Sequence, residues 1–148
     1  MAKMSIMFNG FGVLAEAIDK QGGDLRKAVD DALTETQLHI QQELDTAASA
    51  YASKNKAHPY AEGDMYRAIL KNQQIVWRGN VGEIKVGFDF KAKHGWHSIF
   101  VMYGTPRSLH PIKKDQKLWN AVWGARTKKD IAKIQSDTMR KYLNLGGD

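Results

Sequence analysis

The stretch that decides the fold is LRKAVDDALTETQLHIQQELDTAASAY, residues 25–51. Its apolar and small side chains recur at helical spacing, and neither Gly nor Pro occurs from residue 25 to residue 57. This pattern predicts one amphipathic helix, about 40 Å long, with Asp24 as its N-cap. The stripe that we expect to face the core comprises Leu25, Val29, Ala32, Leu33, Thr36, Ile40, Leu44, Ala47, Ala48 and Tyr51.

Shorter elements are expected after this helix. Residues 65–70 predict a helical turn, and residues 75–79 and 83–90 predict two strands joined by a Gly-Asn-Val-Gly turn. In the second strand, apolar and polar residues alternate, which is typical of an antiparallel sheet with one solvated face. The C-terminal third predicts further helices on either side of Gly124.

Before the long helix, residues 4–8 predict a short strand and residues 13–18 a short helix. Taken together, the pattern predicts an α+β fold: a long N-terminal helix packed on a small antiparallel sheet, with C-terminal helices. We expect one domain over residues 1–148, with residues 145–148 frayed.

Composition favours an ordinary globular chain. The 148 residues are 43% apolar and 26% charged, and no apolar run approaches the length needed to span a bilayer. The N-terminus does not match a secretory signal, so synthesis in the cytoplasm is expected. The net charge of +6 is concentrated after residue 90, which fits a phosphate-binding surface, an acidic protein partner or a solvated face.

The sequence contains no catalytic pattern that we recognise. It has no Cys, no Gly-rich phosphate loop and no nucleophile elbow. His94 and His97 are spaced i, i+3 with His110 nearby, but no third ligand has a motif spacing, and Lys91 and Lys93 add positive charge. We therefore expect no catalytic residues, cofactor or metal. A basic nuclease that uses scattered His and Lys residues is the enzymatic alternative.

Two of the four tryptophans are candidates for contact with another chain. Trp96 lies between two His residues in a polar stretch, and Trp123 lies beside Gly124. Aromatic residues are enriched at interface hot spots, although a place in the core is equally expected for each.

Two further stretches carry a resemblance to a known family. The loop HPYAEG leads into EGDMYRAI (residues 62–69), and SIFVMYGT (residues 98–105) follows the expected strands. This order resembles the tail-completion, or head–tail joining, proteins of long-tailed bacteriophages, which carry a Thr-Gly-x-Leu-Arg-x-Ser-Ile signature and a later aromatic-Gly-Thr segment. Matching positions are Gly63, Ile69, Tyr103, Gly104 and Thr105, whereas Glu62, Met65 and Tyr66 depart from the pattern.

The resemblance implies a non-enzymatic assembly protein in the neck of a bacteriophage virion, made in the host cytoplasm. Such proteins form rings around the DNA channel, and a hexamer is expected. The partners would be further copies of the chain, the head–tail connector, tail-tube or tail-terminator proteins, and the genomic DNA in the channel. A tail terminator of the same virion region, and a small basic nucleic-acid-binding protein, stay open as alternatives.

The corner in SIFVMYGTPRSLHP has a physical interpretation of its own. Residues 99–103 are expected to pack on the sheet and the long helix, and Gly104 would permit a reversal that strains other residues. Pro106 restricts the residue before it, so the loop at residues 107–117 is expected to present cations for docking. A loop that is merely solvated is the alternative. The assembly candidates here are Tyr103, Gly104, Thr105, Arg107, Lys113, Lys114 and Lys117.

Overall fold

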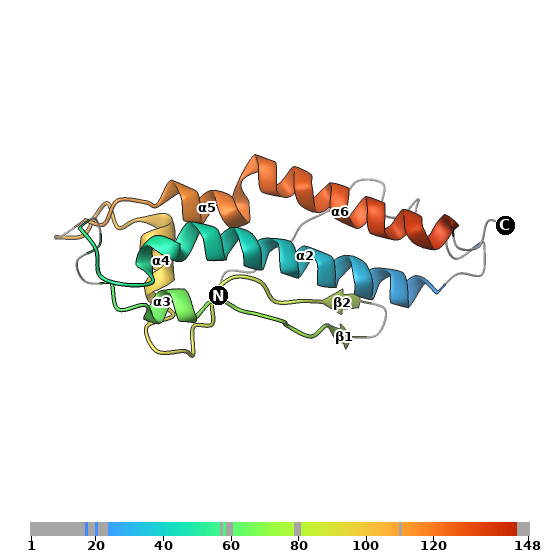
Figure 1. Cartoon of the computed structure of the whole chain (residues 1–148), viewed down its shortest axis with the longest axis horizontal. Helices are drawn as coiled ribbons and strands as arrows, with labels where there is room; N and C mark the ends of the chain where they lie inside the picture. The colour runs from blue at the N-terminus through green and yellow to red at the C-terminus, as the bar shows by residue number, and fades with distance from the viewer. Residues whose placement is uncertain are drawn as a thin grey trace.

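The computed structural model describes residues 24–56, 58, 61–78, 81–109 and 111–144, with Ala17 and Lys20 as isolated positions. It is an elongated, mostly helical molecule built along one long helix (Figure 1). The expected fold is confirmed: a long N-terminal helix, a small two-stranded antiparallel sheet, and a long C-terminal helix packed on the first. Outside the described residues lie the predicted strand at 4–8, most of the predicted helix at 13–18, the turn residues 79–80, His110 and the end at 145–148.

Helix α2 (Leu25–Ala48) is the spine of the molecule and continues into a 3-10 turn, η1 (Ser49–Tyr51). The Asp24 carboxylate accepts a hydrogen bond from Lys27 N at 3.0 Å, which confirms the predicted N-cap. The predicted stripe faces the core, but only half of its ten residues are fully buried: Leu25, Val29, Leu33, Ala47 and Tyr51 are half-buried. The buried side chains of α2 are Ala28, Ala32, Thr36, Gln37, Ile40, Leu44 and Ala48.

Helices α5 (Gln116–Trp123) and α6 (Ala125–Asn144) return along α2 in the opposite direction (Figure 1). α5 covers the C-terminal half of α2, and α6 covers its N-terminal half. The contact between α2 and α6 mixes small, apolar and polar side chains. At its centre Gln135 Nε2 donates a hydrogen bond to Thr36 Oγ1 at 3.2 Å.

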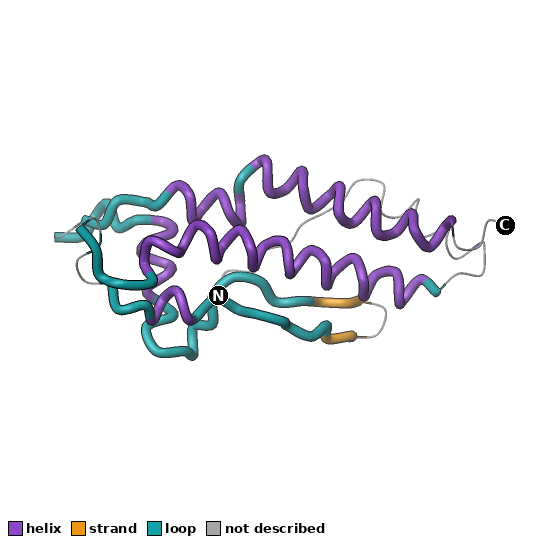
Figure 2. The backbone as a smooth tube through the Cα atoms, in the orientation of Figure 1, coloured by secondary structure: helices purple, strands orange, loops and turns teal. Residues whose placement is uncertain are grey.

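The sheet is a hairpin of β1 (Val76–Arg78) and β2 (Val81–Glu83), which lies along α2 on the side away from α6 (Figure 2). Its register pairs Val76 with Glu83, Trp77 with Gly82 and Arg78 with Val81. Trp77 fixes the hairpin to the long helix, because its Nε1 donates to Asp30 Oδ1 at 2.8 Å.

The predicted second strand at residues 83–90 is too long, because β2 ends at Glu83. The alternation of apolar and polar residues over 83–90 nevertheless predicts burial correctly, since Phe88 is buried and Phe90 half-buried in the main core. The backbone there pairs with a different segment, since Leu70 N donates to Gly87 O at 2.8 Å and Asp89 N donates to Ala68 O at 2.7 Å. This second partner follows the short helix α3 (Asp64–Arg67), which occupies the predicted helical turn.

The apolar segment at residues 99–103 forms part of helix α4 (His97–Tyr103), and its predicted packing on the sheet is wrong, although Met102 shares a core cluster with Ile40 and Leu44 of the long helix. α4 lies against α5 rather than against the sheet, with Ser98 and Met102 as its buried residues. Because side chains in a helix point in all directions around the axis, this segment cannot bury its whole apolar set against one neighbour.

The core is divided in two. The larger cluster lies where α2, α3, α4 and α5 meet, and the smaller one joins the N-terminal part of α2 to the end of α6. Among the described residues, the smaller cluster consists of Ala28, Ala32 and Met139, with Leu25, Val29 and Tyr142 packed around them. None of the helices in the described ranges has both the length and the apolar character needed to cross a membrane.

Candidate functional site

Gly104 ends α4 in a conformation that favours glycine. Its φ is 75° and its ψ 169°, a positive-φ conformation that strains other residues, as expected for this reversal. The chain also passes close by: a Cβ at this position would lie 2.9 Å from Lys114 N and 3.0 Å from Ile112 O. Both the backbone conformation and the close approach therefore exclude a larger residue without local movement.

Thr105 closes the loop that follows this corner. Its backbone N–H donates to Ile112 O at 2.9 Å, and its side-chain Oγ1 accepts from Ile112 N at 2.7 Å. Thr105, an assembly candidate, thus has a structural role that holds the two ends of the loop together. Two hydrogen bonds therefore join the ends of this loop.

Asp115 ties the far end of this loop to three helices, and sequence analysis did not single it out. Its backbone N–H donates to Val101 O in α4 at 2.8 Å, and its Oδ1 caps α5 by accepting from Lys117 N and Leu118 N. Its Oδ2 accepts a hydrogen bond from the Tyr51 hydroxyl at 2.5 Å. Burial, with the neighbouring Asp115 carboxylate, raises the pKa of Tyr51. An Asp just before an apolar helical stretch is the signal that could have found it.

The outer face of α4 is apolar and exposed. Trp96, Ile99, Phe100 and Tyr103, which we call the α4 ridge, have exposed fractions of 48%, 40%, 39% and 43%. Their spacing of i, i+3, i+4 and i+7 places them on one side of the helix. Trp96 and Phe100 meet edge to face with ring centres 5.4 Å apart, so part of the ridge is already ordered. Trp96 and Tyr103 therefore belong to one surface.

Cationic side chains follow α4 in the loop and at the start of α5. Arg107, Lys113, Lys114 and Lys117 are all exposed, as the docking hypothesis requires. Lys114 also has an internal contact, because its Nζ lies 4.1 Å from the centre of the Trp119 ring. Lys117 lines a groove of about 440 Å³ formed by α2, α5 and the start of α6, and Glu43 is among the other lining residues.

Trp123 does not join this surface. It is half-buried and packs against the larger core cluster, which separates it from Trp96. Of the predicted candidates, the structure thus gathers Trp96, Tyr103, Gly104, Thr105, Arg107, Lys113 and Lys114 around α4 and its corner.

A second cluster lies at the other end of α4, around Asp64. His94 Nδ1 lies 2.8 Å from Asp64 Oδ2, Arg67 Nη2 donates to Oδ1 at 2.6 Å, and Lys93 Nζ is 3.6 Å away. The hydrogen bonds from His94 and Arg67 hold the pKa of Asp64 below its usual range. His97 stacks on His94 with ring centres 4.8 Å apart.

This cluster bears on the expected absence of a metal. Possible ligand atoms of Glu62, Asp64 and His94 lie within 4.8 Å of one another, so the fold supplies carboxylates that sequence spacing did not reveal. The charges of Arg67 and Lys93 beside Asp64 nevertheless oppose a divalent ion there. The cluster is explained as an ion-pair network, in which Asp64 holds the His94 side chain while the His94 backbone has a positive φ of 55°. Absence of a metal stays a prediction.

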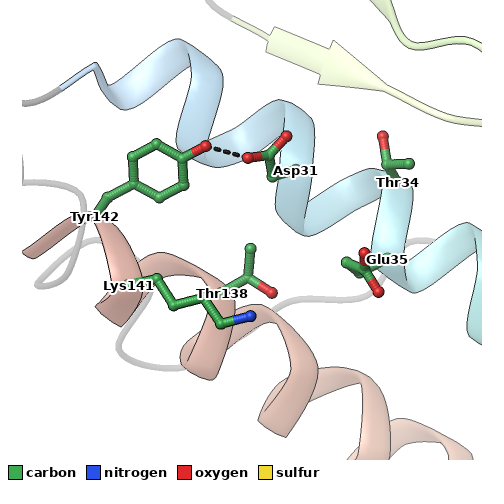
Figure 3. Close-up of a pocket in the computed structure, with 6 residues that line it drawn as sticks. All are labelled: Asp31, Thr34, Glu35, Thr138, Lys141 and Tyr142. Atoms are coloured by element: carbon green, nitrogen blue, oxygen red, sulfur yellow. Dashed lines mark hydrogen bonds between the residues drawn. The ribbon is translucent and has the colours of Figure 1, made fainter. Parts of the chain in front are cut away.

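A polar cleft of about 290 Å³ lies between α2 and α6, lined by Asp31, Thr34, Glu35, Thr138, Lys141 and Tyr142 (Figure 3). The Tyr142 hydroxyl points at Asp31 and donates a hydrogen bond to it. That bond, with burial and the carboxylate charge, raises the pKa of Tyr142 to about 12. The Tyr142 hydroxyl therefore stays protonated at neutral pH and serves as a hydrogen-bond donor to Asp31.

Comparisons with protein-family models, with curated proteins and with solved structures find no match. The geometry around α4 is therefore the main structural guide to function. It consists of an ordered apolar ridge, a corner that requires glycine, and a closed cationic loop.

Proposed function

We propose that the chain is a non-enzymatic assembly protein of a bacteriophage virion, acting in tail completion at the junction of head and tail. The observation that supports this best is the α4 ridge beside the loop at residues 105–112. Stable protein interfaces combine a central group of aromatic residues with a polar or charged rim, and this end of the molecule offers both. The sequence resemblance to head–tail joining proteins supplies the biological setting.

The contacts in and around the corner favour docking over catalysis. Gly104, Thr105 and Asp115 use their backbone and polar groups to fix the shape of the loop. The side chains left pointing outward are apolar or cationic, which suits recognition of another surface. A catalytic site would instead be expected to enclose paired acid, base or nucleophilic groups in a concave pocket.

A ring around the DNA channel is the assembly that we propose, with six copies. Closed rings form from heterologous contacts between copies when the rotation closes. The exposed cations of α6 suit a surface that faces DNA phosphates inside such a ring. These cations are Arg126, Lys128, Lys129, Lys133, Arg140 and Lys141.

Mass measurement in solution tests the proposal. The protein is measured alone, then with purified connector and tail proteins of the phage that encodes it. We expect a ring, alone or on addition of a neck partner. A chain that stays monomeric with every neck and tail protein, yet binds duplex DNA with an affinity that falls steeply with salt, would favour the nucleic-acid-binding alternative.

A further inference from the structure

We propose that the α4 ridge is the centre of a docking surface for an amphipathic segment of another protein, with an apolar face and acidic flanks. The surface is extended by Leu109 and Ile112 on the adjoining loop. That this partner belongs to the virion neck rests on the proposed function. The chemical character expected of the partner is inferred from the described side chains alone.

The apolar residues of α4 are more exposed than those of the neighbouring helix α5. The neighbouring helix α5 is similar in length, and its apolar residues Leu118, Ala121 and Val122 are buried. In α4 the two residues that are buried are Ser98 and Met102, whereas an aromatic and aliphatic face points outward. Burying that face against a partner would remove a large apolar area from water, which favours binding.

The ridge is held in place before any partner arrives. Ser98 Oγ donates to Gly95 O at 2.8 Å at the start of α4, and Asp115 N donates to Val101 O at its end. The edge-to-face contact between Trp96 and Phe100 orders two of the four ridge side chains. A preorganised surface loses less conformational entropy on binding.

Leu109 is a further exposed apolar side chain, on the loop that follows α4. Its side chain is 91% exposed, the highest value among the large apolar residues described, and Ile112 is 43% exposed. The hydrogen bonds between Thr105 and Ile112 fix the base of the loop that carries Leu109. An apolar residue presented in this way suits an anchor that enters a partner's pocket.

The exposed charges of the segments that enter and leave α4 are cationic, although Glu62 and Asp64 of another segment lie beside His94. Lys91, Lys93, Arg107 and Lys113 are exposed in the segments that enter and leave α4. The carboxylates of these segments, Asp89 and Asp115, are half-buried acceptors of internal hydrogen bonds. Within the described residues, Lys93 is the one of these four that lies close to a carboxylate, with its Nζ 3.6 Å from Asp64 Oδ2. An acidic rim on the partner is the complement of this surface.

Two other occupants fit less well. A second copy would bring another basic chain of net charge +6 toward this cationic end. Nucleic acid would satisfy the cations, but protein–DNA interfaces are strongly polar, and Ile99, Leu109 and Ile112 would gain little from phosphate or sugar contacts.

The test uses three labelled helical peptides of about 20 residues, long enough to be helical in water. They share one Leu/Phe face and carry Glu, Gln or Lys on the flanks. Fluorescence anisotropy measures their binding to the full chain. We expect the Glu peptide to bind at least about tenfold more tightly than the other two, and its advantage to shrink with added salt.

Variants locate the binding surface. The double variant Ile99→Ala, Phe100→Ala should weaken binding of the Glu peptide at least about tenfold. The double variant Arg107→Gln, Lys113→Gln should reduce the salt dependence of that binding. Val76→Ala is the matched control, because Val76 is 52% exposed on β1 and away from the ridge. Circular dichroism verifies that each variant is folded.

Several results would overturn the inference. Equal binding of the three peptides, or binding unchanged by the ridge variant, would remove its basis. If a 20-nucleotide duplex or single strand binds more tightly than the Glu peptide, and the ridge variant loses this binding, the surface is assigned to nucleic acid. Self-association lost in that variant would assign it to a second copy. Because these assays need no virion protein, the inference and the proposed function can fail separately.

Discussion

The hydroxyl of Tyr51, at the end of the long helix, donates a hydrogen bond of 2.5 Å to the Asp115 carboxylate that caps α5. The two residues are 64 positions apart in sequence. Asp115 also holds α4 through its backbone, so this one contact connects the spine of the molecule to both sides of the cationic loop.

Tyr51→Phe should therefore lower the free energy of unfolding by about 1–3 kcal/mol, because it removes a half-buried hydrogen bond to a charged group. Asp115→Ala should cost more, since the α5 cap, worth about 0.5–2 kcal/mol, is lost as well. Urea unfolding measures both. If the double variant equals the sum of the single variants, the hydrogen bond contributes no coupling.

Alkaline pH should destabilise the chain through Tyr142. Its hydrogen bond to Asp31 holds the folded-state pKa at about 12, above the ordinary value of 10.0. The folded chain thus binds this proton more tightly than the unfolded chain, so the stabilisation is complete below pH 10 and is lost as pH rises toward 12. Tyr142→Phe should flatten this part of the stability profile, measured by urea midpoints. An identical slope in the variant would exclude Tyr142 as the cause.

Two leucines of α2 should differ in their importance. Leu44 is fully buried and Leu33 half-buried. Leu44→Ala should cost about 2–5 kcal/mol by leaving a cavity, and Leu33→Ala about 1–2 kcal/mol through lost apolar burial. Thermal and urea unfolding give both values. Equal losses would show that the two sites are packed alike.

Gly104→Val should destabilise by more than about 1 kcal/mol, because Gly104 has a positive φ and the chain passes close to it. Gly87 separates the two causes: its φ is 109°, and a Cβ there would meet nothing within 4 Å. Gly104→Ala should therefore cost more than Gly87→Ala. Equal costs would show that backbone conformation alone matters at Gly104.

The cationic loop should matter for attachment more than for folding. Lys113→Gln should leave stability unchanged, and Lys114→Gln should cost about 0.5–1 kcal/mol through its contact with Trp119. When the double variant is supplied to a phage that lacks the protein, we expect free heads and free tails to accumulate. Normal titres with a folded double variant would contradict a docking role for these two lysines.

The sequence predicted the long helix well, because its stripe is regular and its Asp24 cap is local. It also located the corner, since a Gly-Thr-Pro series restricts the backbone by itself. It did not predict the packing of α4, because a short apolar run does not show which of its faces is covered. It missed Asp115 and the Asp64 cluster, whose partners are distant in sequence: Tyr51 for the first, His94 for the second.

The polar contacts in the α2–α6 interface determine how far along each other the two helices lie. Small residues such as Ala28 and Ala32 would allow sliding, but a shift by one turn would separate Gln135 from Thr36 and leave a buried amide without its partner, at about 1–3 kcal/mol. His39 of α2 also faces α6, with its Nε2 3.6 Å from Asp130 Oδ2, but this buried nitrogen has no hydrogen-bond partner among the described residues. The register of α2 and α6 therefore sets the spacing between the α4 ridge and the far end of α6.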